Sequence, residues 1–241
     1  MVYVIADIHG SVSRYYKITK YMPKFTEDDV VIIAGDAGLS YGPYSMDALK
    51  ACMAREKCTF VVMRGNHDNR YWDMAEKDRD NWVIDMNTEL AYEKRYPNIK
   101  YVRDTGGVYT IDHNDILFIP GGYSPDKWYR LENNMPFEPK EELTVEEADA
   151  LMEEIETGHF DYIVSHVAPY ALRPRLEDLF LDYVDQDSVS LFTEKFLDEV
   201  YNDCQWTEWL FGHYHADRYF DDLDMTMVYD KYGVIGDELP V

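Results

Sequence analysis

The chain has 241 residues, of which 46% are hydrophobic and 15% aromatic, and this is enough to bury the core of one large domain. Its formal net charge of -24 at pH 7 makes an acidic surface, which repels nucleic acid backbones and anionic membranes. We therefore expect no stable nucleic-acid binding and no membrane partner.

Three apolar stretches organise the first third of the sequence, and each ends in polar residues. They are "MVYVIA" at 1–6, "DVVIIAG" at 29–35 and "CTFVVMRG" at 58–65. Their length and β-branched residues predict strands, and helices are predicted after the first strand and around residues 45 to 56. This order predicts strand–helix–strand crossovers in a partly parallel sheet, where ligands gather beyond the carboxyl ends of the strands.

The later sequence predicts a hairpin, two helices and further strands. "GGVYTIDHNDILFIPGG" reads as two strands with a turn at residues 112–115. A capping box of Thr144 and Glu147 begins a helix that we expect to end at Gly158, and a second helix is expected over residues 188–203. Strands are expected at "FDYIVSH", "TEWLFGHYHADRYF" and "MTMVYDKYGVI". No repeat or linker interrupts the pattern, so residues 1–241 are predicted to form a single domain.

The ends of the predicted strands carry the same kinds of polar side chain. Five of the seven histidines lie directly after strands. The carboxylate, amide and imidazole residues at these ends are Asp7, His9, Asp36, Asn66, His67, Asp68, His166, His213 and His215. One histidine beside a strand would be unremarkable, but the repetition predicts a shared site.

The spacing of these residues favours a metal centre. Asp7 and His9 are two residues apart, as are His213 and His215, so in an extended backbone both side chains of each pair point the same way. Imidazole with carboxylate suits Zn, Fe, Mn, Co or Ni, and the absence of thiolate argues against a closed structural zinc site. The candidate donors exceed what one tetrahedral ion needs. Two ions sharing a carboxylate would use them, and a two-metal site clamps phosphate oxygens and activates water.

The ordered set D-x-H, G-D, G-N-H-D, a lone H and G-H-x-H, which runs from Asp7 to His215, resembles the calcineurin-like metallophosphoesterases. The resemblance implies an α/β fold, a four-layer αββα sandwich in which two mixed β-sheets are flanked by helices. It also implies two divalent or trivalent metal ions, of Mn, Fe or Zn. The first ion would be held by Asp7, His9 and His215, the second by Asn66, His166 and His213, and both would share Asp36.

The resemblance further implies that a hydroxide bridging the two ions attacks phosphorus in line. His67 would then protonate the leaving oxygen or stabilise the phosphate, and Asp68 would orient its ring. These roles are physically consistent, because a catalytic imidazole must keep a nitrogen free to exchange a proton.

Contacts to the substrate stay open in the sequence. Arg64, Tyr123, Lys127 and Arg130 could each line the pocket or serve the backbone of a turn. Protein Ser/Thr phosphatases of the superfamily continue their second motif with an acidic residue and an arginine, whereas this chain has "GDAGLSYG". We therefore expect a phosphomonoesterase acting on another phosphorylated substrate, with a phosphodiesterase or nuclease, or a non-catalytic protein-binding scaffold, as the alternatives.

The remaining histidines and the cysteines carry no functional signal. His113 and His159 are expected to be ordinary surface residues. Cys52, Cys58 and Cys204 lie in no metal-type spacing, so we expect reduced packing residues in a cytoplasmic protein. The N-terminal "MVYVIADIHG" has no basic region before its apolar residues and does not resemble a signal peptide.

Overall fold

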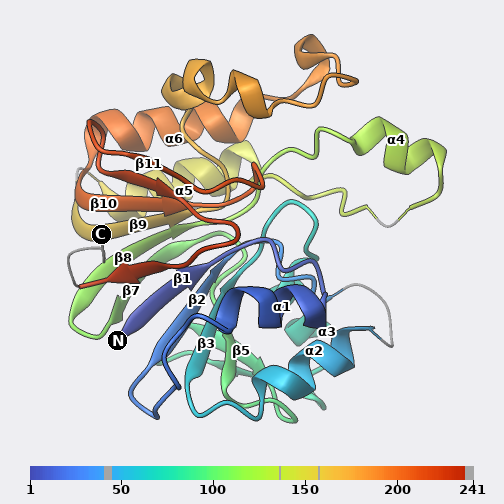
Figure 1. Ribbon diagram of the computed structural model, residues 1–241, viewed down its shortest axis with the longest axis vertical. Coiled ribbons are helices and arrows are strands. Elements are labelled where there is room, and N and C mark those ends of the chain that lie inside the picture. Colours follow the sequence, from blue (N-terminus) through green and yellow to red (C-terminus); the bar gives the residue numbers. More distant parts are fainter. Residues whose placement is uncertain (41–44, 136, 157, 237–241) are drawn as a thin grey trace.

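Two mixed β-sheets lie face to face, and helices cover their outer faces (Figure 1). The computed structural model describes residues 1–40, 45–135, 137–156 and 158–236. Within these residues one sheet has seven strands in the order β13-β1-β2-β3-β6-β5-β4, and the other has six in the order β11-β12-β10-β9-β8-β7. The expected α/β class and four-layer αββα architecture are therefore confirmed.

The seven-stranded sheet has a parallel centre and antiparallel edges. Its parallel strands are β1 (Val2–Ile5), β2 (Val30–Ala34), β3 (Thr59–Met63) and β6 (Ile99–Tyr101). Its antiparallel strands are β13 (Gly233–Ile235), β5 (Leu90–Glu93) and β4 (Trp82–Asp85). The predicted crossovers in the first third of the chain produce the parallel centre, so that prediction is confirmed.

The six-stranded sheet is built in the same way. Its parallel strands are β8 (Asn114–Ile119), β9 (His159–Ser165), β10 (Gln205–Phe211) and β12 (Met225–Met227). The strands β7 (Gly107–Ile111) and β11 (Arg218–Phe220) are antiparallel to their neighbours. The predicted hairpin of β7 and β8 is confirmed. Its two turn residues, Asp112 and His113, have φ of 49° and 67°, as a type I′ turn requires.

Helices form the two outer layers. On the seven-stranded sheet lie α1 (Val12–Thr19), α2 (Ser45–Met53) and α3 (Tyr71–Lys77), and on the six-stranded sheet lie α5 (Val145–Ile155) and α6 (Phe192–Asp203). The short α4 (Lys127–Glu132) stands away from both sheets on a long loop (Figure 1). In the described part of the chain, no helix is long and apolar enough to cross a membrane.

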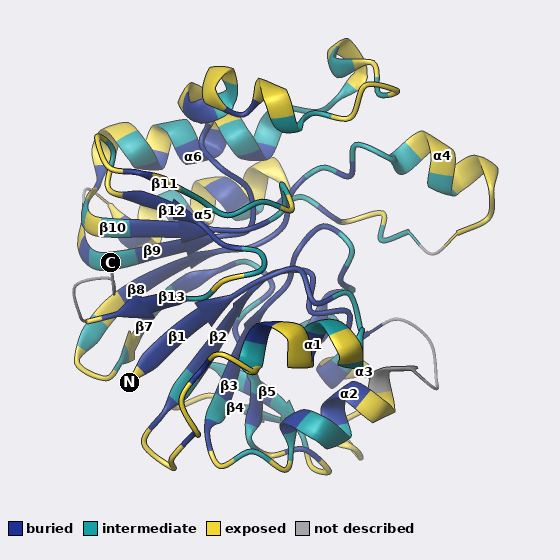
Figure 2. Ribbon diagram, in the orientation of Figure 1, coloured by how far each residue is buried: buried dark blue, intermediate teal, exposed yellow. Residues whose placement is uncertain are grey.

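Alternate residues of the central strands pack into different layers, because successive side chains of a strand point to opposite faces. In β1, Tyr3 and Ile5 pack with the helices of their own sheet, whereas Val2 and Val4 pack against the other sheet. Figure 2 shows the central strands buried along their length. Burial on both faces explains why these strands read as continuous apolar runs in the sequence.

Two expected helix boundaries were wrong, each for a local structural reason. The helix expected over residues 188–203 begins at Phe192, because Gln186–Ser188 form a separate 3₁₀ turn. Val189 therefore lies outside the helix. The helix begun by the Thr144–Glu147 capping box ends at Ile155 rather than at Gly158, since Glu156 already has a left-handed backbone with φ of 46°.

The residues without a predicted function behave as expected. His113 and His159 are exposed. Cys58 and Cys204 are buried free thiols, Cys52 is a partly buried one, and burial raises the pKa of the Cys58 thiol to about 12. The three cysteines are therefore packing residues, while the expected cytoplasmic location stays a prediction.

Candidate metal centre

The polar loops after five parallel strands meet at one end of the molecule, between the two sheets. The loops after β1, β2 and β3 come from one sheet, and those after β9 and β10 come from the other. They bring together all seven expected metal ligands, namely Asp7, His9, Asp36, Asn66, His166, His213 and His215. The carboxyl ends of these strands meet there because the parallel strands of both sheets run toward the same end of the molecule.

The backbone of this site is strained where the candidate ligands attach. Asp7, His9, Asp36, His213 and His215 have positive φ of 54°, 51°, 49°, 70° and 52°. Non-glycine residues adopt this left-handed conformation rarely, and such strain collects at functional sites.

The first cluster of donors comes from β1 and β10. His9 Nε2 lies 3.0 Å from His215 Nε2. Asp7 Oδ1 lies 4.0 Å from His9 Nε2 and 3.8 Å from His215 Nε2. These three donor atoms all lie within 4.8 Å of one another, close enough to share a single ion.

The second cluster converges on the side-chain oxygen of Asn66. His166 Nε2 lies 2.8 Å from Asn66 Oδ1, and His213 Nδ1 lies 3.1 Å from the same oxygen. Asp36 connects the two clusters, because its Oδ1 lies 3.5 Å from His166 Nε2 and its Oδ2 lies 3.8 Å from His9 Nδ1. The two oxygens of one carboxylate thus face both clusters.

Close approach of the loops depends on Gly65, which precedes Asn66. A Cβ atom added to Gly65 would lie only 2.1 Å from Asp36 Oδ1. The glycine of the "GNHD" motif is therefore needed because another side chain would occupy the space of the shared carboxylate.

Burial shifts the pKa values of the candidate ligands. Burial, reinforced by the Asp68 carboxylate, raises the pKa of Asp7 to about 7 and the pKa of Asp36 well above its usual range. Burial also lowers the pKa of His9 to about 3 and of His166 to about 4, so both imidazoles are neutral, the form that binds metals. Buried carboxylates of this kind need a cation to remain charged.

An unsatisfied buried atom supports the fit to metal ions. Asp7 Oδ1 is buried and accepts no hydrogen bond within the described residues, whereas Asp7 Oδ2 accepts the backbone N–H of His213 at 2.9 Å. A cation between Asp7 Oδ1 and the two imidazoles of its cluster would satisfy that oxygen. The donor set of carboxylate, imidazole and amide oxygen fits Mn, Fe or Zn.

Two hydrogen bonds orient the ligands of the second cluster. His166 Nδ1 lies 3.0 Å from the Ala34 carbonyl, so this nitrogen carries the proton and Nε2 keeps its lone pair. Asn66 Nδ2 donates to Ser124 Oγ at 2.8 Å, which turns Asn66 Oδ1 toward the histidines. Ser124 lies in the "GGYSPDKWYR" stretch, and no sequence pattern distinguishes it there.

His67 lies beside the two clusters, and Arg130 contacts it. His67 Nε2 is 3.3 Å from Arg130 Nη2 and 3.4 Å from Asn66 Nδ2, and both of these groups can only donate. His67 Nε2 is therefore an acceptor on a neutral ring. Burial, and then the charge of Arg130, lower the pKa of His67 to about 2.

Asp68 has contacts different from those expected. Among the described residues no hydrogen bond joins its carboxylate to the His67 ring. Instead Asp68 accepts the backbone N–H groups of Ala37 at 3.1 Å, Gly38 at 2.9 Å and Gly65 at 3.0 Å. It is fully buried and ties the loop after β2 to the loop after β3. Its position near His67 in the sequence therefore does not make it the orienting group of that ring.

The four candidate substrate contacts separate into two pairs. Tyr123 and Arg130 line the cavity beside the clusters, whereas Arg64 and Lys127 do not. Arg64 is 1% exposed and donates to the backbone carbonyls of Asp104 at 3.0 Å and Glu141 at 2.7 Å, so it holds backbone. Lys127 Nζ lies 3.6 Å from Glu141 Oε1.

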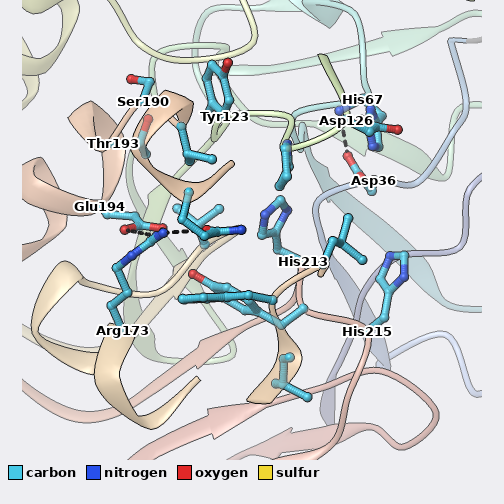
Figure 3. Close-up of a pocket in the computed structure, with 18 of the residues that line it drawn as sticks. Asp36, His67, Tyr123, Asp126, Arg173, Ser190, Thr193, Glu194, His213 and His215 are labelled. Carbon is cyan, nitrogen blue, oxygen red and sulfur yellow. Dashed lines mark hydrogen bonds and ion pairs between the residues drawn. The ribbon is translucent and has the colours of Figure 1, made fainter. Parts of the chain in front are cut away.

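A cavity of about 570 Å³ opens from the clusters. Figure 3 shows Asp36, His67, His213 and His215 along one side, with Arg173, Glu194 and Thr193 on the other. The cavity lies within the size range of small-molecule sites.

The sequence matches the calcineurin-like phosphoesterase family over residues 1–217. No curated protein matches it. Among solved structures, phosphopantetheinyl hydrolase from Mycobacterium tuberculosis is similar at 13% identity and a TM-score of 0.50, over 95% of this chain and 89% of that chain. A protein of unknown function from Aquifex aeolicus is similar at 12% identity and a TM-score of 0.40, over 96% and 89% of the two chains. At 13% identity, the first of these shows a shared fold alone.

Proposed function

Because the chain belongs to the calcineurin-like phosphoesterases, whose members hydrolyse phosphoesters with bound metal, we propose that it is a dinuclear phosphoesterase that favours phosphate monoesters. The observation that carries this proposal is the position of Asp36. Its two carboxylate oxygens face two separate donor clusters, and the cavity reaches Asp36 itself.

The proposed division of ligands follows the two clusters. One ion of Mn, Fe or Zn would be held by Asp7, His9 and His215 and another by Asn66, His166 and His213, with Asp36 common to both. Ions in such a site supply a deprotonated water as nucleophile and neutralise charge on the phosphate. The strained loops and the buried Asp68 carboxylate keep the donors in place before any ion binds.

Arg130 would bind the phosphate in place of the arginine that is absent from the "GDAGLSYG" motif. Its guanidinium reaches the cavity beside His67, and Asp126 Oδ2 accepts its Nε–H at 2.8 Å, which orients it. A guanidinium forms paired hydrogen bonds to phosphate oxygens, and a monoester dianion offers more of them than a diester.

His67 would act on the leaving oxygen. Its neutral ring, held by Arg130, can accept or donate a hydrogen bond there. Burial and then the charge of Arg130 lower the pKa of His67, and a dianionic phosphate beside Arg130 would offset the second of these. Binding of the substrate would thus shift the ring toward the protonated form that a general acid needs.

The test is hydrolysis of p-nitrophenyl phosphate and bis(p-nitrophenyl) phosphate by protein stripped with a chelator and reloaded with Mn. We expect metal-dependent hydrolysis with kcat/KM for the monoester at least roughly tenfold that for the diester. A preference for the diester would support a phosphodiesterase or nuclease instead. If the metal-loaded protein hydrolysed neither ester, the enzyme proposal would be wrong and the scaffold alternative would remain.

A further inference from the structure

The part of the cavity beyond the metal centre is enclosed by two projecting segments. The α4 arm consists of residues 121–135 and 137–141, and the 170–190 segment contains three 3₁₀ turns, Tyr170–Arg175, Glu177–Leu179 and Gln186–Ser188. Both project from the same end of the molecule (Figure 1). The Tyr123 hydroxyl donates to the Ser188 carbonyl at 3.4 Å, which links the arm to the segment.

Apolar and aromatic side chains make most of this outer wall. They include Tyr123, Leu179, Phe180, Leu181, Tyr183 and Tyr214. Leu181 is 40% exposed and Tyr183 is 74% exposed, although both are large and hydrophobic. A wall of this kind fits the carbon skeleton of a leaving alcohol.

Two arginines of the cavity already have carboxylate partners. Arg130 pairs with Asp126 at 2.8 Å within the α4 arm. Arg173 Nη1 lies 3.0 Å from each oxygen of Glu194, and its Nη2 donates to Gln186 Oε1 at 2.7 Å. These pairs leave little positive charge to receive a second anionic group of a substrate.

Glu142 differs from these residues, because no ion pair within the described residues involves it. Its Oε1 accepts the backbone N–H of Thr193 at 3.2 Å and the Thr193 hydroxyl at 2.9 Å, at the start of α6. Within the same residues Oε2 has no hydrogen bond. Since Thr193 lies across the cavity from His213 and Asp36 in Figure 3, Glu142 belongs to the side away from the metal centre.

Other carboxylates lie near Glu142 and affect the pKa values of its neighbours. Burial raises the pKa of Glu194, and the charges of Asp198 and Glu142 add to that rise while Arg173 opposes it. Burial likewise raises the pKa of Tyr123, and the charges of Glu141 and Glu142 add to this rise. Arg173 is paired with Glu194, so Glu142 is the carboxylate at this end of the cavity for which the described residues show no ion pair.

Resting on the proposed function, we propose that the substrate is the phosphate monoester of an alcohol carrying an ammonium group, with Glu142 as the counter-ion of that group. The phosphate would lie at the metal centre and Arg130, the carbon chain against the apolar wall, and the ammonium beside Glu142 Oε2. A terminal carboxylate or second phosphate would face Glu142 and is therefore disfavoured.

The direct test compares ω-aminoalkyl, ω-hydroxyalkyl and ω-carboxyalkyl phosphates of equal chain length, across a series of lengths, on the Mn-loaded protein. At the best chain length we expect kcat/KM to rank amine above alcohol above carboxylate, with at least roughly tenfold between amine and alcohol. Equal rates for amine and alcohol at every length, or a faster carboxylate, would overturn the inference. Failure to hydrolyse any of these esters or p-nitrophenyl phosphate would instead overturn the proposed function.

Glu142→Gln isolates the charge, because glutamine keeps an oxygen that can accept from Thr193. We expect this variant to lose the preference for amine over alcohol. Glu146→Gln removes the same charge from an exposed position of α5 outside the cavity, and it should keep that preference. Because the readout is a ratio of two substrates on one variant, a general loss of activity does not alter it. An unchanged ratio in Glu142→Gln would contradict the assignment of Glu142.

Discussion

At the scale of single residues, five of the seven candidate ligands share a left-handed backbone. Each strained aspartate or histidine costs of order 1–3 kcal/mol, so the surrounding fold must hold it. In Asp7 and Asp36 the strain accompanies buried carboxylates whose pKa values are raised by burial. Bound cations would explain both the backbone strain and the buried charge at these two residues.

The two roles assigned at this scale can be separated by two substitutions. Asp36→Asn removes the charge common to both clusters, so we expect it to lose bound metal and nearly all activity. His67→Ala leaves every proposed ligand in place, so it should keep its metal while turnover falls roughly 10²–10⁴-fold. Metal content by atomic emission and kcat by p-nitrophenyl phosphate assay check both. Equal metal loss in the two variants would contradict the division of roles.

At the scale of elements, the α4 arm is held at its base by buried backbone contacts. Arg64 Nη1 donates to the Glu141 carbonyl at 2.7 Å, and the Gly122 N–H donates to the same carbonyl at 3.2 Å. The arm therefore leaves and re-enters the body of the protein at one point. We therefore expect Arg64 to act on the substrate only through the placement of the arm that carries Tyr123 and Arg130.

Gly121 at this base offers a test of that coupling. Its φ is 84°, and an added Cβ would lie 2.4 Å from the Glu141 carbonyl oxygen. We expect Gly121→Ala to destabilise the protein by roughly 2–4 kcal/mol in urea unfolding and to lower kcat/KM without loss of metal.

The control is Gly236→Ala. Gly236 also has positive φ, 96°, but among the described residues nothing lies within 4 Å of its added Cβ, so its variant is expected to carry backbone strain without a clash. It should lose only about 1 kcal/mol and keep its activity. Equal destabilisation by both substitutions would show that the base of the arm can relax around a side chain.

At the scale of the whole molecule, two sheets must come together before the metal centre exists. The first cluster takes Asp7 and His9 from one sheet and His215 from the other. The hydrophobic cluster between the sheets, which includes Val4, Ile32 and Leu210, therefore positions the ligands as well as stabilising the fold. Metal binding should in turn stabilise the contact between the sheets.

The pH dependence of this stabilisation follows from Asp7. Burial raises the pKa of the Asp7 carboxyl from 3.8 to about 7 in the folded protein. In the metal-free protein, the folded state therefore gains stability from protonated Asp7 at low pH, and this gain is lost as the pH rises from 3.8 to about 7. Bound metal replaces that proton. We therefore expect the rise in Tm on adding Mn to chelator-treated protein to be larger above about pH 7 than near about pH 5.

Thermal unfolding with Mn or chelator at each pH measures this difference directly, and Asp7→Asn serves as the control. The amide has no charge to neutralise, so the variant should show a smaller Mn effect with a weaker dependence on pH. A Mn effect that was the same at both pH values in the unsubstituted protein would contradict this account of the buried carboxylate.

The sequence by itself determined most of the central strands, the polar residues at their ends and the family, because strand periodicity and motif spacing are local properties of the chain. It did not predict β4, β5 and β6, and it placed β12 and β13, which lie in different sheets, in one stretch. Only the tertiary structure decided which groups these polar residues contact. Arg64 holds backbone 77 residues away, while Arg130 reaches His67 across 63 residues. Asp68 binds backbone amides rather than the adjacent imidazole, and the contacts of Ser124 and Glu142 are visible only in the fold. These assignments depend on which distant groups meet in space, and no local pattern encodes that.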